Sequence, residues 1–177
     1  MQNKKNKFSL LFNDKLALVS SIFLVLILFT AIFGPLLTSD LSTKMNLRLR
    51  NLPPFSLEHG FMYIFGADAL GRSMVARLII ASQNTMFIAG TAVFISMSLG
   101  GVLGLISGYY GGSIGNLIMR LADIIMSFPS LLLAVIVLYI FEPGLINLVL
   151  VLAFTRMPVY MRTARAEVLE IRERLFV

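Results

Sequence analysis

The sequence has 177 residues, of which 58% are hydrophobic and only 14% are charged, and its mean hydropathy is +0.87. Soluble domains carry about 25% charged residues, so the composition excludes an ordinary cytosolic globular protein. The lack of cysteine excludes disulfides and thiolate sites, and a single histidine, His59, argues against a histidine-based dyad or metal cluster. The formal net charge of +6 would suit a nucleic-acid binder or a membrane protein, and the hydropathy favours the membrane protein.

Residues 1–15 and 16–37 are predicted to be a cytoplasmic N-terminus and a first membrane span. A bilayer core of about 30 Å needs roughly 20 apolar residues in a helix, and residues 16–37 are 22 residues without a charge. A cleaved signal peptide is the alternative, but its apolar run is usually about 7–15 residues long. No clear small-residue cleavage site follows the run, so we expect a retained span.

Residues 38–83 are predicted to form an external segment. The pair Pro53-Pro54 interrupts it, and we expect a short amphipathic helix from about Leu70 to Ala81. His59 falls in this segment and is expected to be a solvated loop residue.

A second span is predicted from Asn84 to about Tyr109. No charged residue occurs between Arg77 and Arg120, which is 42 positions and too long for one span. We expect the turn that closes the second span in the G-G-S-I-G-N stretch at residues 111–116, because clustered glycines with Ser and Asn interrupt helices.

The second predicted span carries small residues at every fourth position. In lipid, close backbone approach through small side chains is a main source of attraction between helices, so we expect this helix to pack tightly against a neighbour. The alternative is that glycine is simply frequent in membrane helices. This small-residue ladder comprises Ala92, Ser96, Gly100, Gly104, Gly108 and Gly112.

A third span is predicted over Ile124–Phe141. Arg120 and Asp123 precede it three residues apart, so they can pair on one helix face. The alternative is that they only anchor the helix at the membrane interface. Pro129 removes a backbone donor and predicts a kink, and Glu-Pro-Gly at residues 142–144 predicts a tight turn.

A fourth span is predicted from Leu145 to residue 161, although Arg156 and Pro158 lie within it. Residues 162–177 are strongly charged and should continue as a cytoplasmic helix. Glu170 and Arg174 are correctly spaced for an i,i+4 ion pair. This helix has an apolar stripe that needs a partner, made of Val168, Ile171 and Leu175.

The distribution of basic residues supports four spans with both ends in the cytoplasm. Ten Lys and Arg residues fall on the predicted cytoplasmic side and five on the outside, as the positive-inside rule requires. The cytoplasmic set is Lys4, Lys5, Lys7, Lys15, Arg120, Arg156, Arg162, Arg165, Arg172 and Arg174. The external set is Lys44, Arg48, Arg50, Arg72 and Arg77.

Several functional patterns are missing from the chain. It has no G-x-x-x-x-G-K-[ST] phosphate loop, so it does not bind a nucleotide in that manner. No acidic residue is predicted in mid-membrane, where proton relays need one, and the scattered carboxylates do not suggest a hydrolase. We expect no catalytic residue, cofactor or metal site in this chain. Nucleic acid is not an expected partner, because uncharged spans divide the positive charges.

Four stretches of the chain form a distinctive series. They are F-G-A-D-A-L-G-R-S-M-V-A-R-L (65–78), S-G-Y-Y-G-G (107–112), M-R-L-A-D-I-I-M-S-F-P-S-L-L-L-A (119–134) and M-R-T-A-R-A-E-V-L-E-I-R-E-R-L-F-V (161–177). In this order they resemble the C-type inner-membrane permease subunit of dipeptide, oligopeptide and nickel ABC importers, a binding-protein-dependent transport permease. The family's G-T-D-x-x-G-R-D pattern falls on residues 66–73, where Ala67 and Ser73 depart from it.

The resemblance implies an all-α polytopic protein of a bacterial inner membrane, with about four transmembrane helices here and six in a full-length relative. It also implies membrane lipid and four protein partners: a second permease subunit, two cytoplasmic ATPase subunits that bind the ATP, and an extracytoplasmic solute-binding protein. The expected structural or gating residues are Asp68, Gly71, Arg72, Gly100, Gly104, Gly108, Arg120, Asp123, Pro129 and Arg165.

In this family, the stretch that resembles residues 170–177 leads into the cytoplasmic E-A-A loop, whose coupling helix contacts the ATPase. We therefore expect either a fragment or a naturally shortened product. A peptide importer is the first hypothesis for the cargo, and nickel or a metal chelate follows closely. The alternative hypothesis is a transport-inactive four-span membrane protein with a structural role or none.

Overall fold

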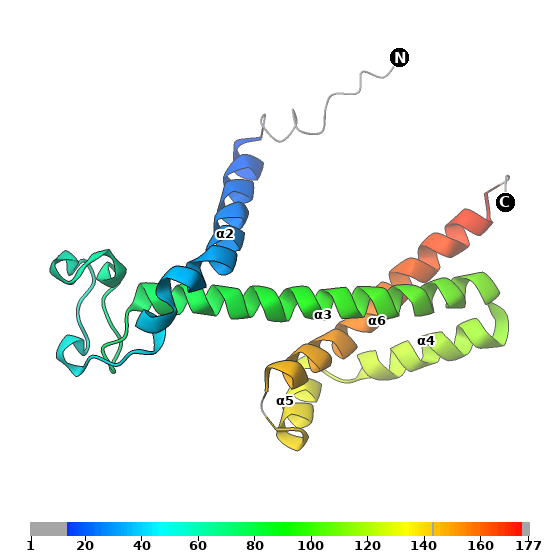
Figure 1. Ribbon diagram of the computed structural model, residues 1–177. Helices are drawn as coiled ribbons and strands as arrows, with labels where there is room; N and C mark the ends of the chain where they lie inside the picture. The colour runs from blue at the N-terminus through cyan, green and yellow to red at the C-terminus, as the bar shows by residue number, and fades with distance from the viewer. Residues whose placement is uncertain (1–13, 143, 175–177) are drawn as a thin grey trace, which may run out of the picture. The chain divides into compact units, whose positions relative to one another are not determined.

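The computed structural model describes residues 14–142 and 144–174, and within these ranges the protein is all-α (Figure 1). Three 3₁₀ turns lie between the first two α-helices. The helices are α2 (Lys15–Thr43), α3 (Met74–Tyr110), α4 (Gly112–Ser127), α5 (Ser130–Ile140) and α6 (Leu145–Arg172). The turns are η1 (Leu47–Leu49), η2 (Leu57–His59) and η3 (Phe61–Tyr63). Lys4, Lys5, Lys7, Pro143 and Leu175, which entered the sequence predictions, lie outside the described residues.

The chain divides into two compact units at Met86 and Phe87, within α3. The first unit holds α2, the three turns and the beginning of α3. The second holds the rest of α3 with α4, α5 and α6.

In the first unit, α2 extends beyond the predicted span 16–37. It begins where the Asp14 carboxylate accepts hydrogen bonds from the N–H groups of Leu16 and Ala17. It ends at Thr43, after which the Lys44 N–H donates to the Asp40 carbonyl oxygen at 2.8 Å. The predicted span 16–37 agrees with the apolar stretch Lys15–Leu36 of this helix. The helix itself continues to Thr43, because polar residues can extend a helix beyond the membrane core.

The segment between α2 and α3 is folded back on itself by backbone hydrogen bonds. The N–H groups of Asn46 and Asn51 donate to the carbonyl oxygens of Leu70 and Asp68, each at 3.1 Å. His59 is exposed, as predicted. The two ends of the segment are therefore held together at the beginning of α3.

The predicted amphipathic helix over Leu70–Ala81 does not exist as a separate element. Residues 70–73 form a turn, in which Gly71 has a φ of +72°. Helix α3 begins at Met74 and continues without a break to Tyr110, so it also includes the predicted second span. No Gly or Pro occurs between Met74 and Ala89 to separate the two, and polar Gln83 and Asn84 do not end a helix.

In the second unit, the predicted turn at residues 111–116 and the predicted third span were partly wrong. Only Gly111, with a φ of +60°, separates α3 from α4, which begins at Gly112. The chain then breaks between α4 and α5 with a bend of 85°. Phe128 is extended because a residue before proline disfavours the helical conformation, and Pro129 precedes the first residue of α5. The predicted change of direction at Pro129 is confirmed. It divides the chain into two helices and does not merely bend one.

Helix α6 passes through Pro158 and continues to Arg172. The predicted boundary between a fourth span and a separate helix at residue 162 is therefore not a break in the helix. The predicted ion pair between Glu170 and Arg174, which lies two residues beyond the end of α6, is confirmed, because Arg174 Nη2 lies 2.8 Å from Glu170 Oε1.

Three helices are long and apolar enough to cross a membrane in the described part of the chain, namely α2 over Lys15–Leu36, α3 and α6. The bent pair of α4 and α5 gives a fourth if it forms one span. The protein is an all-α polytopic membrane protein, and the side of the membrane on which each end lies remains a prediction.

Candidate functional site

The small-residue ladder forms a tight seam with α6 in the second unit. Gly100, Gly104 and Gly108 are buried against α6. A Cβ atom on Gly100 would lie 2.6 Å from the Met157 carbonyl oxygen, and one on Gly108 would lie 2.7 Å from Val168 Cβ. The predicted close packing is thus confirmed, and the neighbour is another helix of the same chain.

The first two residues of the ladder extend the seam toward the start of α6. Its predicted last residue, Gly112, does not belong to the seam. Ala92 packs with Val149 and Ala153 in a buried cluster, and the Ser96 hydroxyl is buried and donates to the Ala92 carbonyl oxygen at 2.8 Å. Gly112 is exposed, has no atom near its missing Cβ and begins α4. The seam therefore comprises Ala92, Ser96, Gly100, Gly104 and Gly108.

The seam also fixes the relative direction of α3 and α6. Gly100 faces Met157, Gly104 faces Met161, and Gly108 faces Arg165, so residue numbers rise together along both helices. Two helices that run in the same direction need the chain between them to return to its starting side. If α3 and α6 both span the bilayer, α4 and α5 together carry the chain back across it.

Two arginines of α6 hold the connection between α3 and α4. Arg172 Nη1 donates to the carbonyl oxygens of Gly108 and Tyr109 at 2.9 and 3.0 Å. These carbonyls belong to the last turn of α3, which lacks partners within its own helix and favours a cation. The Gly115 carbonyl oxygen accepts from Arg165 Nη1 at 3.3 Å and from the buried Ser107 hydroxyl at 3.0 Å.

Arg165 is among the structural or gating residues expected from the sequence, whereas Arg172 and Ser107 are not. Arg172 lies seven residues after Arg165, which is two helical turns and places it on the same face of α6. That spacing could have indicated the pair.

Helix α4 is tied to α6 by an ion pair that local spacing did not predict. Asp123 Oδ1 lies 2.6 Å from Arg162 Nη2, and the two side chains are 60% and 51% exposed. The predicted Arg120–Asp123 pair was wrong, because Asp123 contacts an arginine 39 residues away instead. Arg120 is exposed.

We expect a small but measurable coupling between Asp123 and Arg162. The variants Asp123→Asn and Arg162→Gln, alone and together, should give a coupling free energy of about 0.2–1 kcal/mol, the usual range for exposed ion pairs. Unfolding of the reconstituted chain by sodium dodecyl sulfate, followed by circular dichroism, measures it. The matched cycle of Asp123→Asn with Arg120→Gln should give no coupling, and equal couplings in both cycles would contradict the observed pairing.

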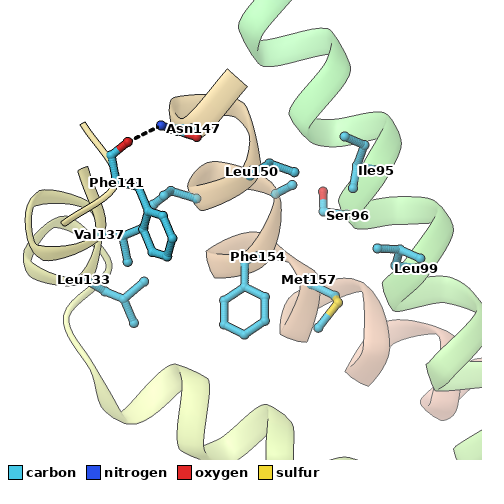
Figure 2. Close-up of a pocket in the computed structure, with 12 residues that line it drawn as sticks. Ile95, Ser96, Leu99, Leu133, Val137, Phe141, Asn147, Leu150, Phe154 and Met157 are labelled. Carbon is cyan, nitrogen blue, oxygen red and sulfur yellow. Dashed lines mark hydrogen bonds between the residues drawn. The ribbon is translucent and has the colours of Figure 1, made fainter. Parts of the chain in front are cut away.

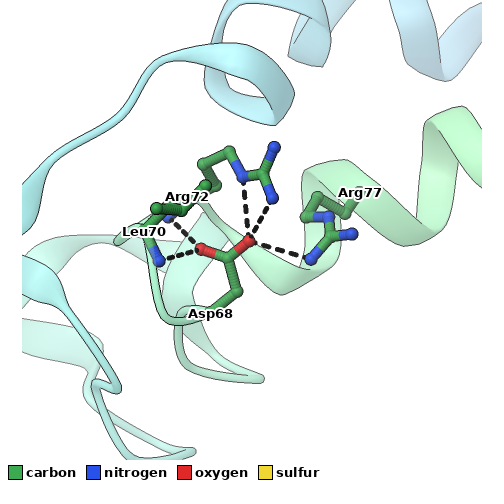
Figure 3. Close-up of polar contacts among 4 residues, drawn as sticks. All are labelled: Asp68, Leu70, Arg72 and Arg77. Carbon is green, nitrogen blue, oxygen red and sulfur yellow. Dashed lines mark hydrogen bonds and ion pairs between the residues drawn. The ribbon is translucent and has the colours of Figure 1, made fainter.

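In the first unit, Asp68 accepts four hydrogen bonds and makes a further ion-pair contact (Figure 3). Its Oδ1 atom accepts from the N–H groups of Leu70 and Arg72, both at 2.9 Å. Its Oδ2 atom contacts Nε and Nη2 of Arg72 and Nη1 of Arg77, each at 2.8 Å. The predicted Asp68–Arg72 pair is confirmed, but it lies on a turn and not on a helix. Arg77 was not among the predicted site residues.

The electrostatic surroundings of Asp68 strongly favour its charged form. Its side chain is only 12% exposed. The Arg72 N–H is the largest of the contributions that lower the pKa of Asp68 to about 2, and the Arg72 guanidinium and the Leu70 N–H add to it against the cost of burial. Gly71, at the tip of the same turn, is buried against the Asn46 backbone, which leaves no room for a Cβ. Asp68 therefore joins the turn to the first helical turns of α3.

A pocket of about 340 Å³ lies among α3, α5 and α6 (Figure 2). The twelve residues that line it are all uncharged. Its amide side chain, Asn147, donates to the carbonyl oxygens of Phe141 and Glu142 at 2.7 and 3.0 Å. The Ser96 hydroxyl is bonded within its own helix. The pocket thus offers apolar contact and little polar recognition.

Two protein families match this chain. The family described as "Binding-protein-dependent transport system inner membrane component" matches residues 100–177, which include the seam, α4, α5 and α6. The family described as "N-terminal TM domain of oligopeptide transport permease C" matches residues 8–54, which include α2. The chain belongs to the binding-protein-dependent transport permeases.

Curated relatives agree with this family assignment. The dipeptide transport system permease protein DppC of Haemophilus influenzae is 36% identical over 162 residues, which are 91% of this chain and 55% of that protein. The di/tripeptide transport system permease protein DppC of Pseudomonas aeruginosa is 39% identical over 158 residues, 89% of this chain and 52% of that protein. The oligopeptide transport system permease protein OppC of Bacillus subtilis is 32% identical over 165 residues, 93% and 52% of the two chains. The chain spans about half the length of these relatives.

The structure brings most of the predicted site residues together in two places. Gly100, Gly104, Gly108 and Arg165 belong to the seam and its end, and Asp123 is tied to the same helix. Asp68, Gly71 and Arg72 form the turn before α3. Pro129 stands at the break between α4 and α5, while Arg120 joins neither group.

Proposed function

We propose that this chain forms part of a membrane-spanning permease subunit of an ABC importer for peptides. The observation that carries the proposal is the family match over residues 100–177 together with the α3–α6 seam in the same region. The relatives described above are named for the transport of dipeptides, tripeptides and oligopeptides, and a further relative, 31% identical, is named for glutathione. These names support peptides rather than nickel as the proposed cargo.

We propose the same partners that the family resemblance implies. A second permease subunit would complete the translocation path, two cytoplasmic ATPase subunits would bind and hydrolyse ATP, and an extracytoplasmic solute-binding protein would deliver the cargo. The chain itself would hold no cofactor. The proposed location is the inner membrane of a bacterium, with both ends of α2–α6 on the cytoplasmic side.

Within this proposal, the seam and the residues at its end would act as a structural and gating unit. The seam holds α6 against α3, while Arg165, Arg172 and Asp123 link α6 to α4 and to the α3–α4 connection. A displacement of α6 would therefore be transmitted to α3 and α4. Pro129 would limit that displacement at α5, because the chain is already broken there.

Uptake measurements test the proposal. Disrupting the coding sequence in the host should abolish accumulation of a radiolabelled dipeptide and leave accumulation of radiolabelled nickel unchanged. Restoring the coding sequence in trans is the matched control. Loss of nickel uptake with unchanged dipeptide uptake would assign nickel as the cargo. Unchanged uptake of both would favour the alternative, a transport-inactive four-span membrane protein.

A further inference from the structure

The segment Lys44–Arg50, which we call the basic segment, follows directly after α2 in the first unit. Its sequence is K-M-N-L-R-L-R, so polar and apolar side chains alternate, and three of the four polar ones are cations. Leu47 is 71% exposed and Met45 is 63% exposed, and the three cations are exposed as well. No described residue of the first unit, from Asp14 onward, covers these side chains.

The cations of the basic segment lack the ion pairs that the other basic residues of the predicted external segment form within the described residues. Arg72 and Arg77 are both paired with Asp68. Lys44, Arg48 and Arg50 form no ion pair within the described residues. The nearest carboxylate in sequence, Asp40, is exposed at the end of α2 and reduces the formal charge of residues 40–50 from +3 to +2. The charges of the segment are therefore free to attract an anion from outside the chain.

The backbone of the basic segment is already fixed. The Asn46 side chain accepts from the Arg48 N–H at 3.3 Å, and the Arg50 N–H closes η1 on the Leu47 carbonyl oxygen. The Asn46 N–H is bonded to Leu70, and Gly71 packs against the Asn46 backbone. Binding of a ligand here costs little conformational entropy of the backbone, since the turn that contains Asp68 already holds the segment in place.

The position of the segment along the chain determines which anion it meets. The apolar part of α2, Lys15–Leu36, is about 33 Å long at 1.5 Å per residue, which slightly exceeds a hydrocarbon core of about 30 Å. The seven helical residues that follow extend at most about 10 Å further. Lys44 therefore lies in or just beyond the headgroup layer, within roughly one Debye length of the lipid phosphates.

We propose that the basic segment binds anionic phospholipid headgroups in the leaflet where α2 leaves the membrane. The three cations contact phosphate groups, and Met45 and Leu47 enter the boundary between headgroups and acyl chains. A lipid surface is favoured over an acidic soluble protein because α2 holds the segment at that surface permanently.

The proposal is tested with the full chain in lipid nanodiscs. The chain has no cysteine, so Met45→Cys provides one labelling site for an environment-sensitive fluorophore. Phosphatidylglycerol is raised stepwise in a phosphatidylcholine background, and the fraction that gives half of the fluorescence change is measured. Converting Lys44, Arg48 and Arg50 one at a time to Gln should weaken the apparent lipid affinity by roughly fivefold for each cation. High salt should also weaken the apparent lipid affinity, because it screens the charges.

A variant that is expected to bind anionic lipid more tightly separates a loss of lipid binding from misfolding. Asp40→Asn removes the local negative charge and should lower the phosphatidylglycerol fraction needed, whereas a merely damaged protein would not bind more tightly. Identical responses of all variants, or a response that salt does not change, would overturn the proposal. If an acidic solute-binding protein produced the fluorescence change equally in both lipids, the segment would be a protein contact instead. Transport activity is not part of the readout, so the result is independent of the proposed function.

Discussion

Replacing Gly104 by alanine is expected to destabilise the second unit, and the same replacement at Gly101 is not. The new Cβ on residue 104 would meet the Met161 carbonyl oxygen and lie 2.7 Å from Ala164 Cβ. The obstacle is partly backbone, which cannot rotate away, so α3 and α6 must move apart. Overpacking of this kind costs about 1–3 kcal/mol. Unfolding of the reconstituted chain by sodium dodecyl sulfate, followed by circular dichroism, measures the change.

Gly101 is the matched control because it lies on the same helical turn but has no atom within 4 Å of its missing Cβ. Alanine there should leave the free energy of unfolding unchanged or raise it slightly, since it restricts the unfolded chain. If both replacements had the same effect, the small residues would reflect only the frequency of glycine in membrane helices, and the seam would not be a specific contact.

The second large effect is expected at Asp68. In Asp68→Asn the carboxylate no longer neutralises Arg72 and Arg77, and one of its acceptor positions becomes an NH₂ donor that faces these arginines. The turn before α3 should open, so the N–H groups of Leu70 and Arg72 should exchange with solvent several-fold faster. Hydrogen exchange measured by mass spectrometry on the chain in nanodiscs follows this change. Glu58→Gln, at an exposed acid of the same segment, should leave exchange unaltered.

The pH dependence of the same turn provides an independent check. The pKa of Asp68 is lowered from 3.8 to about 2 in the folded protein. The carboxylate therefore contributes its full stabilisation above its ordinary pKa of 3.8 and loses it as the pH falls through about 2. Protection of the Leu70 and Arg72 amides should persist at pH 4 and disappear toward pH 2. Loss of protection already between pH 5 and pH 4 would contradict the assignment to Asp68.

Sequence patterns predicted the features that depend on local spacing. The four-residue repeat of small residues identified the face of α3 that packs, because that repeat lies along one side of a helix. The proline rule located the break at Pro129, and the i,i+4 rules identified the Asp68–Arg72 and Glu170–Arg174 pairs. Each of these depends on residues less than about two helical turns apart.

Features that depend on tertiary contact were not accessible in this way. No local pattern states that α6 is the partner of α3, or that Asp123 meets Arg162 across 39 residues when Arg120 is three residues away. The helix limits were also misplaced at both ends of the loop before α3, because hydropathy reports where the hydrocarbon ends and helices continue past it. Arg172 was missed since its role is to bind carbonyl groups of another helix.

The register of the seam restricts how α6 can slide along α3. Small residues recur every four positions on α3, and the carbonyls of Met157, Met161 and Arg165 recur every four positions on α6. A slide of about 6 Å, which is four residues at 1.5 Å each, would bring every glycine opposite the next carbonyl, while shorter slides would place bulky side chains against the ladder. The two helices therefore have a few discrete relative positions along their axes and cannot slide smoothly between them. The bonds from Arg172 to the last turn of α3 select the present setting.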